Sequence, residues 1–309
     1  MSTIPRPAGE KHHYLPVFYL KRWAGRDGRL CEYSRPQDAV KPRMTHPSGT
    51  GYERDLYKIN GLRPESSQLL ERRFMKAVDQ RASDTLNRLL DGTDLATLNI
   101  DQKSGWSRFI MSLVQRHPEK ISWITQIVDE RYDDRLAEAE ANYQTFRKPG
   151  DPPTFGEYKA RMDPNAREIL KAELLQTIVD LPTVGAAINK MLWGVATLND
   201  LRPRFLTSDR PVVLTNGIGF EMSHIIMPIS PRALFVAVNT LLKLTQLQQA
   251  LREGTLLDHV NHTVAAQAQK FVYFHDDSQL GFIQDRLGKY PVQFIAPAQT
   301  IPYRPPLRT

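Results

Sequence analysis

Two adjacent histidines near the start of the chain form the densest group of side chains that could do chemistry. His12 and His13 belong to the sequence Lys-His-His-Tyr-Leu-Pro and directly precede an expected helix over residues 16–24. Histidine is a common general base near neutral pH and a common metal ligand, and a helix N-terminus favours bound anions. Adjacent loop histidines point in different directions, so we expect one of them to work with a partner remote in sequence. The alternative is a pair of surface or capping histidines with no chemical role.

Asp209 is the second candidate, because it lies in the polar turn that directly follows an expected strand over residues 204–207. A carboxylate at a strand end is exposed there, and it can bind a metal, act as a base or orient a histidine. Ser208, the residue before it, could contact substrate or serve as a nucleophile. Ordinary turn chemistry, in which both side chains bond to nearby backbone amides, explains the pattern equally well.

Four further positions carry charge where it could serve a site. Glu71 and Asp79 lie eight residues apart on an expected helix and share one of its faces. Arg116 ends the next helix, where a cation offsets the helix dipole, so capping is the simpler explanation. Arg22 lies on the helix that follows the two histidines. We take Arg22 and Arg116 as candidates for holding phosphate.

The elements that must position these groups change in type along the chain. Amphipathic spacing predicts helices over residues 67–90, 101–114, 122–146, 165–179, 241–251 and 258–269. The first of these should bury Leu70, Phe74, Val78 and Leu86 on one face. Short apolar runs predict strands over residues 29–34, 52–59, 192–198, 204–207, 211–214, 225–228, 234–238 and 271–274. The expected fold is therefore α+β, with a central helical region and antiparallel strands contributed by the N-terminal and C-terminal parts.

Composition sets the class of protein. The chain has 309 residues, 41% hydrophobic and 24% charged, which is typical of a folded globular protein rather than a disordered one. We expect a flexible N-terminus over residues 1–10, one α+β domain over residues 11–296 with a possible helical subdomain over residues 67–180, and a Pro-rich tail over residues 297–309.

Cysteine content and hydropathy indicate the compartment. No apolar run approaches the roughly 20 residues that span a bilayer, no signal peptide is visible, and Cys31 is the only cysteine. We therefore expect a soluble cytoplasmic protein with no membrane partner. Cys31 itself is better explained as a small strand residue than as a nucleophile.

The formal net charge of +7 indicates a polyanionic partner, nucleic acid or a nucleotide, although the basic residues are spread over the whole chain. The sequence holds no Gly-rich phosphate loop, nucleophile elbow or HExxH helix, so the common nucleotide and protease chemistries have no support.

The order of the short motifs resembles a known family. His-His-Tyr-x-Pro-x-Phe-Tyr-Leu at residues 12–20, Arg-x-Pro at residues 116–118, Thr-Ser-Asp-x-Pro at residues 207–211, Pro-x-Ser-Pro at residues 228–231 and Asn261 before a closing strand are similar to domain of unknown function 4238. The resemblance covers residues 11 to 275. It implies an intracellular, mostly bacterial protein and carries no established reaction. It groups His12, His13, Arg116 and Asp209 as residues of one site, and it places Asp79 where the family often has Glu.

These observations lead to one main hypothesis and two alternatives. The main hypothesis is a metal-assisted phosphodiester hydrolase acting on nucleic acid or a nucleotide. One of the two histidines, His12 or His13, holds a divalent metal ion together with Asp209, with His13 and Asp209 as the preferred pair. The other histidine or Glu71 activates water, and Arg22 and Arg116 hold phosphate. The first alternative is a non-catalytic nucleic-acid-binding or protein-binding component of a bacterial defence or toxin system. The second is a hydrolase with Ser208 as nucleophile, which we rank last because no Gly-flanked elbow surrounds that residue.

Overall fold

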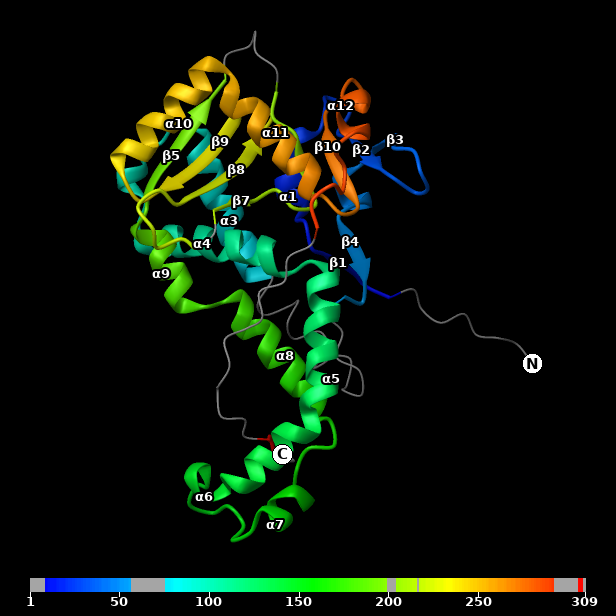
Figure 1. The fold of residues 1–309 in the computed structure, drawn as a ribbon, viewed down its shortest axis with the longest axis vertical. Helices are drawn as coiled ribbons and strands as arrows, with labels where there is room; N and C mark the ends of the chain where they lie inside the picture. The colour runs from blue at the N-terminus through cyan, green and yellow to red at the C-terminus, as the bar shows by residue number, and fades with distance from the viewer. Residues whose placement is uncertain (1–8, 57–75, 199–203, 216, 292–304, 308–309) are drawn as a thin grey trace, which may run out of the picture.

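The computed structural model describes residues 9–56, 76–198, 204–215, 217–291 and 305–307, and it confirms the α+β class. Most helices follow one another in the middle of the chain, and strands from the N-terminal and C-terminal parts pair antiparallel in one shared sheet (Figure 1). Within the described ranges, no helix combines the length and apolarity that crossing a membrane requires.

The strands form one two-stranded ribbon and two four-stranded sheets. The ribbon consists of β1 (Lys11–His13) and β4 (Tyr52–Arg54). The first sheet has the order β3 (Lys41–Thr45), β2 (Leu30–Ser34), β10 (Phe271–Phe274) and β6 (Thr207–Ser208). The second has the order β5 (Leu192–Thr197), β9 (Ala233–Val238), β8 (His224–Ser230) and β7 (Val213–Leu214). Because β6 and β7 are neighbours in sequence but lie in different sheets, the short turn between them joins the two sheets.

The helices divide into those that cover the sheets and those that form a projecting arm. The helices near the sheets are α1 (Val17–Leu20), α3 (Lys76–Leu90), α4 (Ile100–Gln115), α9 (Pro182–Lys190), α10 (Leu241–Glu253), α11 (Thr255–Gln267) and α12 (Leu280–Gln284), with short 3-10 turns at Lys21–Trp23, Pro47–Gly49 and Leu95–Thr97. The arm consists of α5 (Pro118–Ala141), α6 (Tyr143–Phe146), α7 (Phe155–Ala160) and α8 (Ala166–Val179). Figure 1 shows α5 and α8 running away from the sheets, with α6 and α7 at the far end.

Alternating side chains of β9 place this strand between two apolar layers. Leu234, Val236 and Val238 pack with the apolar side chains of α10 and α11, whereas Phe235 belongs to the larger core that includes α4. Successive side chains of a strand point to opposite faces, so a strand with helices on both faces must be apolar throughout. This requirement explains the unbroken run Ala-Leu-Phe-Val-Ala-Val, all of it buried.

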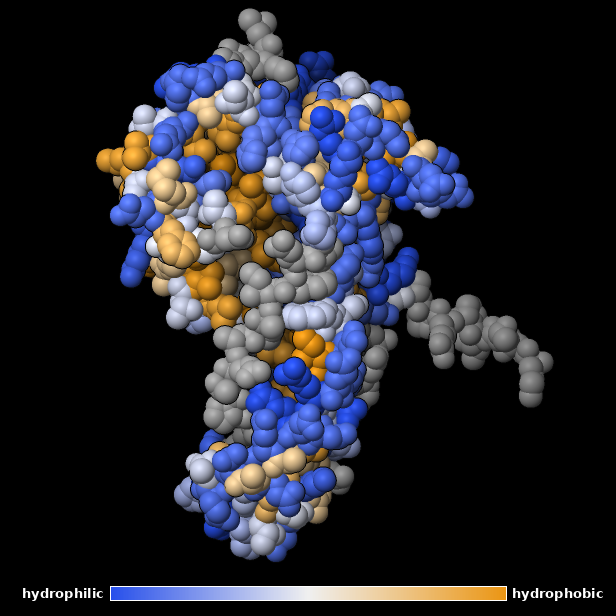
Figure 2. Space-filling model, in the orientation of Figure 1, coloured by the Kyte–Doolittle hydropathy of each residue, from blue (hydrophilic) through white to orange (hydrophobic). Residues whose placement is uncertain are grey.

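In the arm, apolar residues at helical spacing form the contact between α5 and α8. Ile121 and Ile124 of α5 pack against Leu175 and Ile178 of α8, and apolar side chains gather along this inner side in Figure 2. The charged stretch of α5 faces outward, and Asp129 pairs with Lys171 of α8 at 2.8 Å.

Pro118 separates α4 from α5. Proline cannot donate a backbone hydrogen bond and pushes the preceding residue out of the helical region, and His117 accordingly has the extended backbone angles φ −68° and ψ 143°. The chain turns a corner here, which we call the α4–α5 corner (residues 116–118).

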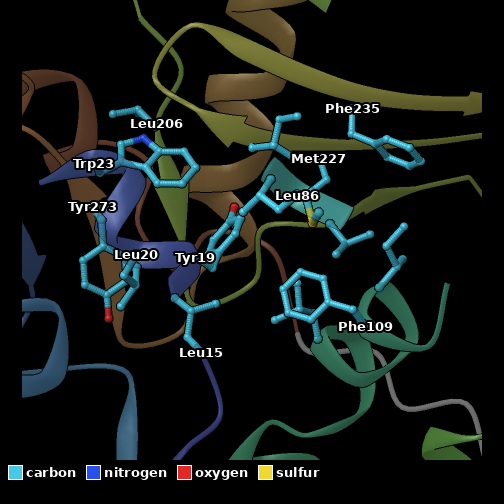
Figure 3. Close-up of a cluster of buried hydrophobic side chains, with 14 of the residues drawn as sticks. Leu15, Tyr19, Leu20, Trp23, Leu86, Phe109, Leu206, Met227, Phe235 and Tyr273 are labelled. Atoms are coloured by element: carbon cyan, nitrogen blue, oxygen red, sulfur yellow. The ribbon is translucent and has the colours of Figure 1, made fainter. Parts of the chain in front are cut away.

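Several motif residues fix α1 to the two sheets, and Tyr19 lies among the buried apolar side chains of the core (Figure 3). The buried hydroxyl of Tyr19 lies 2.7 Å from the Thr207 hydroxyl and donates to the Pro228 carbonyl at 2.7 Å. Asn261 of α11 accepts the Leu206 amide at 2.8 Å and donates to the Arg204 carbonyl at 3.1 Å. These contacts fix β6 relative to α1, β8 and α11, and so they position the polar residues that follow β6.

Candidate functional site

Three motif segments meet where β1 ends, where α4 turns into α5 and where β6 ends. The rings of Tyr14 and His117 lie 6.4 Å apart. The charge of Arg116 acts on His13, the charge of Asp209 acts on Tyr14, and the charge of Arg210 acts on His117. We call this group, residues 13, 14, 116, 117, 209 and 210, the buried polar cluster.

Arg116 occupies the centre of this cluster, and its side chain has no exposed surface. Its Nη1 donates to Oδ1 of Asp79 on α3 at 3.0 Å, and the guanidinium lies 5.8 Å from the ring of Phe109. Its Nε and Nη2 have no hydrogen-bond acceptor among the described residues. Burial raises the pKa of Asp79, against the opposing charge of Arg116. Because arginine stays protonated in proteins, two of its nitrogens are left as buried cationic donors that an anion could satisfy.

His13 lies at the edge of the cluster and is half-buried. Burial lowers its pKa, the charges of Lys11 and Arg116 lower it further, and a hydrogen bond to the Ser48 backbone opposes them. The ring is therefore neutral at pH 7, and a neutral imidazole carries one basic nitrogen. Its Nε2 is buried and has no partner among the described residues, so it is placed to take a proton.

Tyr14 and His117 are both buried and both uncharged. Burial raises the pKa of Tyr14 far above its usual range, and the charges of Asp209 and Glu119 add to the effect. Burial lowers the pKa of His117 to about 3, helped by the charges of Arg210 and Arg116. The Tyr14 hydroxyl has no partner in the described part of the chain. It is therefore a second donor directed into the cluster.

Asp209 was expected to expose its carboxylate, and this expectation is wrong, because the residue is only 3% exposed. Its Oδ1 accepts the Gln269 amide at 3.1 Å, and its Oδ2 accepts the amides of Lys270 at 2.6 Å and Phe271 at 3.3 Å. Desolvation raises its pKa to about 6, while these amides and Arg210 oppose the change. Both carboxylate oxygens thus hold the start of β10 beside the end of β6.

Ser208 and Arg210, on either side of Asp209, also make contacts that stabilise the turn. The Ser208 side-chain oxygen is buried and accepts the Arg210 amide at 3.1 Å. The Arg210 side chain reaches the α4–α5 corner, where its Nη2 lies 3.4 Å from Oε2 of Glu119. Ser208 therefore has the contacts of a turn residue, and Arg210 links the β6–β7 turn to the first turn of α5.

The other predicted site residues lie apart or outside the described ranges. His12 is fully buried on the ribbon, paired with Glu53 of β4 in register. Arg22 hydrogen-bonds to Asn87 of α3. Asn87 lies eight residues after Asp79, the partner of Arg116, on the same helix. At a rise of 1.5 Å per residue, the partners of Arg22 and Arg116 are therefore about 12 Å apart along α3. Glu71 lies outside the described residues.

A divalent cation does not fit the cluster as described. Among the residues that the structure covers, no group of three or more histidine, cysteine, aspartate or glutamate side chains could hold a metal ion. Asp209 could ligate a cation only by giving up backbone amides that both of its oxygens accept. The predicted pair of ligands, His13 and Asp209, would therefore need the turn to rearrange.

A separate hollow on the first sheet offers less chemistry. It has a volume of about 250 Å³ and is lined by Cys31, Pro42, Arg43, Met44, Asp276 and Asp277. Burial raises the pKa of the Cys31 thiol to about 11, so it is a poor nucleophile at neutral pH. Cys31 lies on β2, as expected of a strand residue.

Sequence reasoning did not select Tyr14, His117 or Arg210. Each is adjacent to a residue that was selected, within the same short motif. The types of these residues gave no separate signal, because a tyrosine, a histidine before proline and an arginine in a turn are common as packing and capping residues. Only the convergence of three remote segments distinguishes them.

Fold and site together define an α+β protein in which strands of the N-terminal and C-terminal parts share one sheet and a buried polar cluster contains two arginines. A sequence profile of the family DUF4238, described as a protein of unknown function, matches residues 11–278. The chain belongs to this family. No curated protein and no solved structure matches it.

Proposed function

We propose that this protein binds the phosphate group of a nucleotide or nucleic acid at Arg116 and hydrolyses a phosphodiester there. The observation that carries the proposal is the buried Arg116 guanidinium, whose Nε and Nη2 lack an acceptor among the described residues. These two nitrogens form one edge of the planar guanidinium, the edge that holds two oxygens of a phosphate or carboxylate in parallel hydrogen bonds. A buried charge without such partners costs several kcal/mol, so an anion bound here stabilises the fold.

Phosphate fits the surroundings better than carboxylate does. The buried hydroxyl of Tyr14 offers a third donor. Arg210, which is paired with Glu119 at 3.4 Å, lies near His117, and the net charge of the chain is +7. A tetrahedral phosphate has oxygens for donors on several sides, whereas a carboxylate has two oxygens in one plane.

His13 is the base in the hydrolysis that we propose. Its neutral ring removes a proton from water, the water oxygen attacks phosphorus, and the bond from phosphorus to the leaving oxygen breaks. That oxygen takes a proton from solvent, and His13 returns its proton to solvent. The divalent metal ion that the sequence suggested stays a prediction, and no step here depends on it.

Binding without catalysis is the second candidate function. It is favoured by the contacts of Asp209, because a carboxylate engaged by three backbone amides is not available as a base. The cluster then keeps one basic group, His13, beside two arginines. Such a set can hold a phosphate of nucleic acid without cleaving it, as the alternative of a defence or toxin component requires.

Titration calorimetry tests the phosphate site. Inorganic phosphate, a nucleoside monophosphate and a short oligonucleotide are titrated into protein in buffer free of phosphate and sulfate. Arg116→Lys should weaken binding roughly 10- to 150-fold, because it removes a charge-assisted bidentate contact of about 1.5–3 kcal/mol. Arg22→Met is the matched control and should keep the affinity of the unchanged protein. Equal affinity in Arg116→Lys, or no binding of any of the three ligands, would refute the proposal.

A turnover assay separates the two candidates. A chromogenic phosphodiester and labelled oligonucleotides are incubated with and without added Mg²⁺ or Mn²⁺. Cleavage that disappears in His13→Gln, while phosphate binding persists, supports the hydrolase. Binding that depends on Arg116 without cleavage under any of these conditions supports the non-catalytic candidate.

A further inference from the structure

The β1–β4 ribbon has two chemically different faces. Lys11 pairs with Arg54, His12 with Glu53, and His13 with Tyr52. Because side chains alternate along a strand, residues 11, 13, 52 and 54 share one face while residues 12 and 53 share the other. Burial follows this division, since Lys11 and Arg54 are exposed whereas His12 is fully buried. We call the face with residues 11, 13, 52 and 54 the outer ribbon face.

The outer ribbon face combines cations with an aromatic ring. Nζ of Lys11 lies 4.3 Å from the centre of the Tyr52 ring, and the rings of His13 and Tyr52 lie 5.5 Å apart. Nη1 of Arg54 donates to the Gly9 carbonyl at 2.6 Å. The ring of Tyr52 thus contacts Lys11 and His13, and the cross-strand partners Lys11 and Arg54 place two cations together at one end of the ribbon.

The acidic residue of the ribbon lies on the inner side and is neutralised. Glu53 forms an ion pair with Lys270, which precedes β10. The outer ribbon face therefore presents positive charge without a carboxylate of its own strands. In Figure 1, β1 and β4 lie beside the N-terminal end of α5, next to the α4–α5 corner.

We infer that the outer ribbon face binds single-stranded nucleic acid, with a base stacked on Tyr52 and backbone phosphates at Lys11 and Arg54. Aromatic rings stack on any unpaired base, and flanking cations follow the backbone, which is how single strands are held with little sequence preference. His13 belongs both to this face and to the buried polar cluster, so a strand on the ribbon passes beside Arg116. Only the statement that the strand passes beside Arg116 rests on the proposed phosphate site.

The burial of Arg116 argues for a single strand over a duplex. Its side chain has no exposed surface, and its charge acts on His13, the half-buried residue that the cluster shares with the outer ribbon face. A single strand can direct one phosphate inward while its neighbours stay outside. A duplex keeps its bases paired and stacked, so it has no free base for Tyr52 and no flexible backbone to enter.

Fluorescence anisotropy tests the inference on the full chain with a labelled oligothymidylate of about 12 nucleotides and a duplex of the same length. The single strand should bind more tightly than the duplex. Tyr52→Ala should weaken single-strand binding roughly 5- to 150-fold, the loss usual for one stacked base, whereas Tyr52→Phe should retain it. The melting temperature of each variant shows whether the protein stays folded, and Tyr52→Phe keeps the test valid if Tyr52→Ala unfolds.

Salt dependence tests the two cations. Lys11→Ala and Arg54→Ala should each lower the slope of log affinity against log salt by about 0.7, the value for one single-strand phosphate contact. Lys41→Ala, an exposed lysine on edge strand β3, is the matched control and should leave the slope unchanged.

The outcomes separate this inference from the phosphate site. Inorganic phosphate binding that depends on Arg116, without oligonucleotide binding, overturns the ribbon inference and leaves the phosphate site intact. Oligonucleotide binding that depends on Tyr52 but not on Arg116 supports the ribbon and removes the phosphate site. Tighter binding of the duplex, or an unchanged affinity in Tyr52→Ala, overturns the ribbon inference.

Discussion

Asp209→Asn should destabilise the fold by about 2–4 kcal/mol. The variant keeps the shape of the side chain but replaces one acceptor oxygen with a donor. In its better orientation, the amide oxygen accepts from Lys270 and Phe271 while the amide nitrogen faces the Gln269 amide, donor against donor. One charge-assisted bond, about 1.5–3 kcal/mol, is lost, and a buried donor is left without an acceptor at a cost of about 1–3 kcal/mol. The two remaining bonds lose the charge, and relief from burying that charge offsets part of the sum.

Urea unfolding followed by circular dichroism measures the effect at pH 8, where Asp209 is ionised because its pKa is about 6. Asp27→Asn is the matched control, since Asp27 also accepts a backbone amide, from Arg29 at 3.0 Å, but is exposed. Its midpoint should shift by less than that of Asp209→Asn, because water can replace the lost contact. Equal midpoints for Asp209→Asn and the unchanged protein would show that the three amide contacts contribute nothing. Asp209 would then be free for chemistry, as the sequence first suggested.

Three further predictions concern stability. Burial lowers the pKa of His117 from 6.5 to about 3, so between these pH values the unfolded chain binds a proton that the folded chain does not bind. The free energy of unfolding should therefore fall as pH drops from about 6.5 toward 3. His117→Gln should flatten this part of the pH profile, measured by urea unfolding at several pH values. Tyr19→Phe should cost about 1–3 kcal/mol by leaving the buried Thr207 hydroxyl and Pro228 carbonyl without this partner, and an unchanged thermal midpoint would contradict it. Leu86→Ala should cost about 2–5 kcal/mol because Leu86 is fully buried, and a loss below 1 kcal/mol in calorimetry would mean that the core closes over the gap.

Helices were predictable where one face is apolar over several turns. The expected helix over residues 101–114 is α4 (Ile100–Gln115), and the one over residues 165–179 is α8 (Ala166–Val179). On α3, Val78 and Leu86 are buried as their spacing predicted, while Leu70 and Phe74 lie outside the described residues. Helical periodicity depends only on local spacing, so one segment is enough to reveal it.

Edge strands and short elements were not predictable in the same way. β3 lies in a segment where no strand was predicted. It contains Pro42, and four of its five residues are exposed. An edge strand tolerates proline and needs no apolar face, so it lacks the alternation that identifies strands. β1 was missed because three residues are too few to show any period.

The candidate site was predictable in its members more than in their contacts. The motifs contain His13, Arg116 and Asp209, and the structure brings them to one cluster. That the Asp209 carboxylate is engaged by backbone amides 60 residues and more along the chain depends on strand pairing between β6 and β10. The spacing of residues in the sequence cannot reveal such a contact, because which strands pair depends on the tertiary structure of the whole chain.

The pairing of β2 with β10 also means that, during synthesis, β2 leaves the ribosome long before its partner strand. The hydroxyl of Tyr33, a residue of β2, donates to the Asp276 carbonyl, 243 residues further along the chain. At the usual 5–20 residues per second, the N-terminal strands wait roughly 10–50 s on the ribosome before their partner emerges. During that interval the edge of β2 that β10 later covers has open backbone donors and acceptors, which are the groups that nascent-chain chaperones shield and that aggregation exploits. A premature stop before residue 270 would leave that edge open permanently, so we expect truncated chains to be cleared by proteolysis although they retain both the ribbon and Arg116.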